Sequence, residues 1–496
     1  MRLRILFLSA FFCCTSVLFS QTVIHNPSKS DFSGTLSFLA SDWMEGRGST
    51  QKGGFMASEY IASLMSLYQL KPYNSQTDYY QDFKIQEHTV QKSTFKIKKG
   101  KETISLSETD FRVTPITKSI QNETSVLFAG YGLSIPNEGY DDYKNQNVKN
   151  KIVIVLKGFP SHRDTTTTTF QKLKKLFPEE NNLEEIKLQT AIKNGAAALV
   201  IIDSKETFKP SKHSEDAVFH SLENSETAAI PVFKISKSAA EKLFPQTDIT
   251  TFEKKAQKLQ TSSALLKNST INFSIELQTE TFPVRNVLGM ITGKDTTKTI
   301  IVGAHYDHLG IIKDSIYNGA DDNASGTSGM LALAKKWSES KTKPPYNILF
   351  ASWTAEEMGL LGSEYFVRNF DFSRQKIILA INMDMISRSA PEDKTHRILS
   401  IGTEKENDNL RKIATECNVQ LKNPFSLDLW ETNGHSGSDY ASFTAKGIPI
   451  MTYFSGFHDD YHTPNDKASK VDLDKIHDVL FIVNNSLLKF LEKPLN

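Results

Sequence analysis

Metal-binding and acid–base side chains recur in the C-terminal half of this chain, each time just after an apolar run. His305 and Asp307 follow TIIVGA, Glu356 and Glu357 follow NILFASW, Asp384 follows KIILAINM, and the loop SGFHDDYHTP after IPIMTYF contains His458, Asp459, Asp460 and His462. Ligands of open α/β sheets bind beyond the carboxyl ends of the strands. If the runs are strands of one sheet, we expect these side chains to meet at one edge.

The segment NGADDNASG, residues 318–326, lies between the first of these runs and a predicted helix. Asp, Asn and Ser accept hydrogen bonds from the free N–H groups of a first helical turn, so capping alone explains the segment. Its position also lets Asp321 reach the same sheet edge. A short, tightly turning segment of this kind suits a carboxylate that bridges two metal ions.

Two imidazoles and three carboxylates are a familiar ligand set for a pair of zinc ions, and no thiolate competes for them. Two divalent cations, three carboxylates and one hydroxide also leave the site nearly neutral. Asp384 ends an apolar run, so burial of its charge requires an arginine or a metal as partner. Asp307, two residues after His305, is placed to orient that imidazole. Taken singly, a surface His–Asp pair or a solvated Glu–Glu pair is equally consistent with the sequence.

The elements that position these residues alternate between strand and helix. From residue 282 onward, apolar strands interleave with helices, ending with a helix at 472–491. This pattern predicts an α/β layer sandwich whose sheet is buried on both faces. Residues 53–72, GGFMASEYIASLMSLYQLKP, have helical spacing of apolar residues, and we expect this helix to pack on the same sheet.

A segment with a different sequence pattern interrupts this alternation of strands and helices. Residues 112–276 contain short β-rich runs, VLFAGYGLSI, KIVIVLKGF, AALVIIDS and IPVFKIS, separated by Lys-rich and Thr-rich segments. No His, Cys or paired-acid cluster accompanies these runs. We therefore predict an inserted, non-catalytic domain at 112–276, flanked by the two parts of one domain at 21–111 and 277–496.

The N-terminal residues and the composition limit the cellular location and the kinds of partner that we expect. Residues 1–20 carry two arginines and then an apolar stretch, which is typical of a cleaved secretory signal. Their loss lowers the formal net charge from +1 to −1, which gives no support for nucleic acid or an anionic membrane as partner. No later stretch is apolar enough to span a membrane. Only Cys417 remains after cleavage, so no intrachain disulfide is expected.

The ordered motifs resemble the M28 zinc metallopeptidases, a family of aminopeptidases with co-catalytic zinc. The matching stretches are GAHYDH (303–308), GADDNASG (319–326), SWTAEEMGLLGS (352–363), INMDMI (381–386), and the segment from GSDYASF through FHDDYHTPNDKASKVD; LASDWMEGRGS (39–49) also resembles the start of family members with an insertion. The β-rich middle segment is similar to the protease-associated (PA) domain. The resemblance implies a phosphorylase/hydrolase-like three-layer sandwich around a mixed sheet, with an inserted PA domain.

Carried over by motif, the resemblance implies two Zn²⁺ per chain. Asp321 would bridge the ions, His305 and Asp384 would complete one site, and Glu357 and His462 would complete the other. It also implies a strained, cis-like peptide bond after the bridging aspartate.

The resemblance further implies the catalytic roles. Glu356 would be the general base toward a metal-bridging hydroxide, with Asp307 behind the first imidazole. Tyr461 matches a position that helps stabilise the oxyanion, although packing of a loop aromatic explains it almost as well. His308 and His458 are additional histidines with no assigned role.

One motif departs from the family pattern. Where the family commonly shows Ser-Asp-His, this chain has Ser438, Asp439 and Tyr440, which affects the wall of the substrate site but not the ligand set.

We expect an exported enzyme, periplasmic or secreted, that hydrolyses peptides or proteins at free amino termini. A carboxypeptidase or dipeptidase of the same fold, or a non-catalytic peptide-binding protein on this scaffold, is the alternative. The sequence gives no oligomeric state.

Overall fold

The computed structural model describes residues 24–494, apart from 74–76, 115, 178–180, 204–206, 209–217, 226–229, 245, 262, 341 and 433–436. The predicted signal peptide, residues 1–20, lies outside the described residues. In the described part of the chain no helix is both long and apolar enough to cross a membrane.

The C-terminal half forms the mixed sheet that carries the predicted site. In spatial order its strands are β19 (Ser426–Glu431), β18 (Ile398–Thr403), β20 (Ile450–Phe454), β17 (Lys376–Met383), β13 (Asp295–His305), β16 (Tyr346–Trp353) and the end of β12 (Ala264–Ile291), with the short β1 (Lys71–Pro72) paired to β12. The four central strands β20, β17, β13 and β16 are parallel, whereas β18 pairs antiparallel with β20 and β12 pairs antiparallel with β16.

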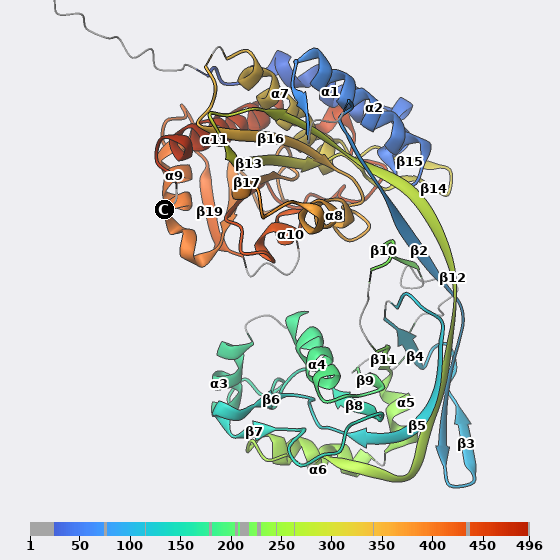
Figure 1. The fold of residues 1–496 in the computed structure, drawn as a ribbon. Coiled ribbons are helices and arrows are strands. Elements are labelled where there is room, and N and C mark those ends of the chain that lie inside the picture. Colours follow the sequence, from blue (N-terminus) through green and yellow to red (C-terminus); the bar gives the residue numbers. More distant parts are fainter. Residues whose placement is uncertain are drawn as a thin grey trace, which may run out of the picture.

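Helices cover both faces of this sheet, as Figure 1 shows. Alternate residues of β13 point to opposite faces: Ile300 and Val302 join one apolar core, and Ile301 joins the other. The larger core receives α1 (Lys29–Leu39), α2 (Lys52–Leu67), α7 (Gly326–Ser338), α9 (Asp408–Asn418) and α11 (Leu473–Glu492), and the smaller receives α8 (Leu361–Asn369) and α10 (Tyr440–Thr444). This is the three-layer α/β sandwich around a mixed sheet that the sequence predicts.

The helix predicted at 53–72 packs on this sheet but ends earlier, at Leu67. Short elements complete this part of the chain: the 3-10 turn at Asp42–Arg47 and the hairpin of β14 (Gly310–Ile312) and β15 (Ser315–Tyr317).

Two very long strands lead from this sandwich into the β-rich part. β2 (Tyr80–Lys99) and β12 pair antiparallel over most of their length and form the curved ribbon at the side of Figure 1. This ribbon was not predicted from the sequence. Because Phe95 of β2 and Phe273 of β12 lie in the core of the β-rich part, while Val287 of β12 lies in the core of the sandwich, the ribbon belongs to both parts.

The β-rich part has its own two apolar cores, one on each face of the strands that continue the sheet beyond β12. Its parallel strands are β5 (Ile120–Phe128), β8 (Ile152–Leu156), β9 (Ala198–Ile202) and β11 (Val232–Ile235). Around them lie β3 (Glu102–Ser105), β4 (Phe111–Val113), β6 (Ser134–Ile135), β7 (Tyr140–Asp141), β10 (Val218–Leu222), α3 (Thr168–Leu176), α4 (Asn181–Lys193), α5 (Lys237–Leu243) and α6 (Gln246–Ala256).

Candidate metal centre

Four parallel strands end at one edge of the large sheet and deliver most of the predicted site residues. His305 is the last residue of β13, Glu356 and Glu357 follow β16, Asp384 follows β17, and His462 lies in the loop after β20. Because these strands run parallel, their carboxyl ends lie at the same edge. The structure thus brings together the side chains that the sequence placed there.

A first group with the donor types of a metal site consists of His305, Asp322 and Asp384, whose ligand atoms lie within 4.8 Å of one another. The Nε2 atom of His305 is 3.2 Å from Oδ1 of Asp384 and 3.5 Å from Oδ1 of Asp322. His305 is buried, so its ring has no access to bulk water.

A second group consists of His308, Asp322, Glu357 and His462. The Nε2 atom of His462 is 3.0 Å from Oε2 of Glu357 and 3.2 Å from Oδ2 of Asp322. The other oxygen of Glu357 lies 2.6 Å from Nδ1 of His308. Asp322 therefore directs one carboxylate oxygen toward each group, which is the geometry of a shared ligand.

Asp322, not the predicted Asp321, occupies the shared position. The buried carboxylate of Asp321 turns the other way and accepts the backbone N–H groups of Ser387 (2.9 Å) and Arg388 (2.8 Å). The two neighbouring side chains diverge because the segment Ala320–Ser325 is an irregular turn, with Asp322 at φ −101° and ψ 97°. The expected cis peptide bond is present after Asp322, one residue later than predicted.

His308 is the site residue to which the sequence analysis gave no role. Its Nδ1 atom contacts Glu357 and lies 3.5 Å from Oδ2 of Asp322, and its side chain is fully buried. The signal was present in the motif His-Tyr-Asp-His, in which a second imidazole follows Asp307 directly. His458 lies outside both groups, and its Nε2 atom is 3.6 Å from Asp321.

Burial and neighbouring charges shift the pKa values of the acidic and imidazole side chains at this site. Burial raises the pKa of Asp322 to about 6, and the neighbouring Glu357 adds to this. Burial alone would lower the pKa of His462, but hydrogen bonds with Asp322 and Glu357 raise it to about 10. Burial also raises the pKa of Glu356 well above its ordinary value.

Burial would likewise raise the pKa of Glu357, yet hydrogen bonds from His308 and His462 hold it well below its ordinary value. The buried Nε2 atom of His462 lies between one carboxylate oxygen of Glu357, at 3.0 Å, and one of Asp322, at 3.2 Å. Converging imidazoles and carboxylates with an excess of negative charge fit divalent zinc, which takes nitrogen and oxygen ligands.

Asp307 connects the site to the N-terminal loop. Its carbonyl oxygen is 3.2 Å from Nδ1 of His305, and its carboxylate accepts the hydroxyl of Ser49 (2.9 Å) and the backbone N–H of Glu356 (3.3 Å). Ser49 also accepts the backbone N–H of Ala355 at 3.0 Å. The loop at 39–49, whose sequence resembles the family, thus holds the segment that carries Glu356.

Two further buried residues, neither identified from the sequence, fix the turn that carries Asp322. The guanidinium of Arg47 donates to the carbonyl oxygens of Asn318 (2.6 Å) and Gly319 (2.8 Å). The carboxylate of Asp466 accepts the backbone N–H groups of Asp321, at 2.9 Å, and Asp322, at 3.1 Å. The turn is therefore held from both sides by charged groups.

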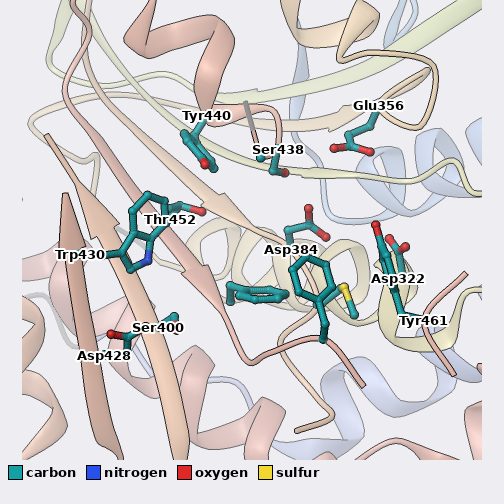
Figure 2. A pocket seen from close by; sticks show the side chains of 14 residues that line it. Asp322, Glu356, Asp384, Ser400, Asp428, Trp430, Ser438, Tyr440, Thr452 and Tyr461 are labelled. Carbon is teal, nitrogen blue, oxygen red and sulfur yellow. Dashed lines mark hydrogen bonds between the residues drawn. The ribbon is translucent and has the colours of Figure 1, made fainter. Parts of the chain in front are cut away.

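A pocket opens beside the two metal groups. Figure 2 shows Asp322, Glu356 and Asp384 at one end of it, with Tyr461 next to them. The Tyr461 ring stacks on His462 with 3.8 Å between ring centroids, and burial raises the pKa of its hydroxyl. The sequence places Tyr461 beside the last ligand, and the structure puts it on the pocket wall.

Fold and site together define an α/β domain with a candidate two-metal centre, interrupted by a β-rich domain. Residues 286–486 match the model of "Peptidase family M28", and residues 124–243 match that of the "PA domain". The chain therefore contains an M28 peptidase domain that carries an inserted PA domain.

Individual relatives agree with this assignment. The "Probable leucine aminopeptidase 2" of Aspergillus fumigatus is 29% identical over 194 residues, covering 38% of this chain and 36% of that protein. The "Probable glutamate carboxypeptidase" of Arthroderma benhamiae is 30% identical over 213 residues, covering 36% of this chain and 27% of that protein. The chain thus spans only about a third of the length of these curated relatives.

Among solved structures, an "Aminopeptidase from Aneurinibacillus sp. strain AM-1" superposes with a TM-score of 0.57. It is 19% identical, and the superposition covers 94% of this chain and 95% of that one. The two proteins therefore share a fold along nearly their whole lengths.

Proposed function

We propose that this protein is a co-catalytic dizinc metallopeptidase that removes residues from the free amino termini of peptides. The observation that carries the proposal is the position of Asp322, whose two carboxylate oxygens face two separate groups of imidazoles and carboxylates. A carboxylate shared in this way suits a pair of divalent ions.

Each ion would be held by residues from both the turn before α7 and the strand ends. His305 and Asp384 would hold one ion, Glu357 and His462 the other, and Asp322 both. When bound, the zinc pair would polarise the scissile carbonyl and lower the pKa of an attacking water.

Glu356 is the residue that moves the proton. It belongs to neither metal group, and one of its carboxylate oxygens lies 4.0 Å from Nε2 of His305. Its backbone is held by Asp307, and burial raises the pKa of its carboxyl, so the ionised carboxylate would be a stronger base that takes a proton from water and delivers it to the leaving amine. Tyr461, on the pocket wall beside Asp322, would donate a hydrogen bond from its hydroxyl to the oxygen that becomes negative.

Carboxypeptidase or dipeptidase action uses the same metal centre and is the alternative, along with peptide binding without catalysis. We also propose that the mature chain acts outside the cytoplasm, on the basis of the signal-like residues 1–20.

The test combines metal analysis with hydrolysis of short peptides in free and amino-blocked forms. We expect about two zinc ions per chain and loss of hydrolysis when the amino terminus is blocked. Equal rates on both forms would refute the aminopeptidase proposal and favour endopeptidase or carboxypeptidase action.

The variant Glu356→Gln should retain zinc and lose turnover, because the amide cannot accept the proton of water. Glu364→Gln, on the partly exposed side of α8 where Glu364 pairs with Arg368, is the matched control and should keep full activity. Retained turnover in Glu356→Gln would remove Glu356 from the role of base.

A further inference from the structure

The pocket beside the metal groups extends well beyond them. Its volume is about 390 Å³, and its lining runs from Asp322, Glu356 and Asp384 to Ser400 and Asp428 at the other end. Figure 2 shows Ser400 and Asp428 on the opposite side of the pocket from Glu356 and Asp322.

The strand register explains how Asp428 comes to face this pocket. Ser400 of β18 lies opposite Asp428 of β19 on one side and Phe454 of β20 on the other. Because neighbouring residues in register point to the same face of a sheet, these three side chains form one row. Asp384 follows β17, the next strand beyond β20, so about three strand spacings of ~4.8 Å, roughly 14 Å, separate it from Asp428.

A second row forms the apolar floor of the pocket. Gly402 of β18 lies between Trp430 of β19 and Thr452 of β20. A Cβ atom at Gly402 would come within 2.4 Å of the Trp430 ring, so the glycine lets the indole lie across the floor. The remaining aromatic lining residues are Tyr440, Phe454, Phe457 and Tyr461. Tyr440 stands where the family commonly has histidine, and its ring meets Trp430 edge-on at 5.9 Å.

The charge at the far end is negative and uncompensated. Among the described residues that line the pocket there is no Lys, Arg or His. Asp428 is exposed to solvent at this end of the pocket and accepts a hydrogen bond from the Ser400 hydroxyl at 2.8 Å. The pocket therefore offers a long aromatic channel that ends at a carboxylate.

We propose that this pocket selects peptides whose amino-terminal residue is lysine or arginine; this rests on the proposed aminopeptidase function. The long alkyl stem would lie along Trp430 and Phe454, and the cationic end would meet Asp428 and Ser400. Aromatic faces also attract cations, so the lining helps to hold the head group. A leucine side chain is too short to reach Asp428 and would therefore gain no ion pair there.

The test compares matched substrates that differ only in the head group. The kcat/KM values of lysyl and norleucyl p-nitroanilides, and of arginyl and citrullyl p-nitroanilides, are measured for the zinc-loaded protein. We expect the cationic member of each pair to be preferred about fivefold, the range of a partly exposed ion pair, and the preference to shrink in high salt.

The variant Asp428→Asn should lower the lysyl-to-norleucyl ratio to about one. Glu431→Gln lies on the same strand but on the opposite face, and it should keep the wild-type ratio. A wild-type preference for norleucine, or an unchanged ratio in Asp428→Asn, would overturn the selectivity while leaving the aminopeptidase function intact. Failure of the zinc-loaded protein to cleave any of the four substrates would instead overturn the proposed function, and the selectivity with it.

Discussion

Replacing Asp466 with asparagine should weaken zinc binding by about one to two orders of magnitude without removing any side chain of the metal groups. Asp466 is fully buried, and one carboxylate oxygen accepts the backbone N–H groups of Asp321 (2.9 Å) and Asp322 (3.1 Å). These two bonds fix the turn from which Asp322 reaches both groups.

The magnitude follows from what asparagine retains. Hydrogen bonds to a charged acceptor contribute about 1.5–3 kcal/mol each, and neutral ones about 0.5–1.5 kcal/mol. Replacing the charged acceptor with a neutral one therefore weakens the two hydrogen bonds by about 2–3 kcal/mol in total. Since ~1.4 kcal/mol corresponds to tenfold in an equilibrium constant, the expected loss of zinc affinity is about 30- to 140-fold, near the range typical when a group supporting metal ligands is changed.

The assay is zinc affinity measured by competition with a chelating dye, with thermal unfolding of the zinc-free protein recorded in parallel. Asp460→Asn is the matched control. Asp460 lies in the same loop and pairs with Arg388 (2.7 Å) and Lys470 (2.8 Å), but these partners are side chains and not the backbone of the turn. If both variants bind zinc within twofold of each other, the reasoning that Asp466 positions Asp322 is refuted.

Three further predictions concern other parts of the molecule. Asp322→Ala should abolish zinc binding at both groups, whereas Asp321→Asn should retain measurable binding; metal analysis after dialysis distinguishes them, and the reverse order would restore Asp321 as the bridge. Tyr461→Phe should lower kcat about 100-fold with little change in KM if the hydroxyl stabilises the oxyanion, and unchanged kcat would assign the ring to packing alone. Asp31 pairs with two lysines of α7. Burial opposes its charge, but those lysines and a serine lower the pKa of its carboxyl. Asp31 therefore stabilises the folded state above its unfolded pKa of about 3.8, and this contribution is lost as the pH falls below that value. Asp31→Asn should therefore lower the free energy of unfolding by about 1 kcal/mol at pH 7. The difference, measured by denaturant titration, should shrink progressively as the pH falls below about 4, and a difference independent of pH would contradict this.

The sheet edge could be predicted from the sequence because it depends on residue type and strand order alone. His305, Glu356 and Asp384 each follow a run that is apolar on both faces, and such runs form the parallel centre of a sheet. Parallel strands end at a common edge, so the meeting of these side chains follows without knowledge of any loop.

The choice between Asp321 and Asp322 could not be predicted in this way. Both are aspartates in one short turn, and which carboxylate faces the metal groups depends on backbone angles inside that turn. Those angles are fixed by Arg47 and Asp466, which are about 275 and 145 residues away and act on backbone atoms. A contact with a backbone group leaves no trace in the identity of the partner residue, so it cannot be recognised in a single sequence.

The long ribbon escaped prediction for a related reason. Much of β2 and β12 is partly exposed and rich in Lys, Thr and Glu, so neither strand has the apolar run by which buried strands are recognised. Each is stabilised by pairing with the other over nearly twenty positions, and that pairing joins residues far apart in the chain.

Metal affinity and substrate selectivity should therefore be separable in this protein. The groups that fix the metal ligands, Asp466 and Arg47, act on the turn before α7, whereas Asp428 and Trp430 lie on β19, the outermost strand of the large sheet. Three strand spacings separate β19 from β17, and in the described part of the chain Asp428 makes its side-chain hydrogen bond with Ser400 of the neighbouring strand. Substitutions on β19 should shift the preferred amino-terminal residue at constant zinc content, while substitutions behind the turn should change zinc content at constant preference. A variant of Asp428 that loses zinc would show that the far end of the pocket and the metal groups are coupled through the sheet.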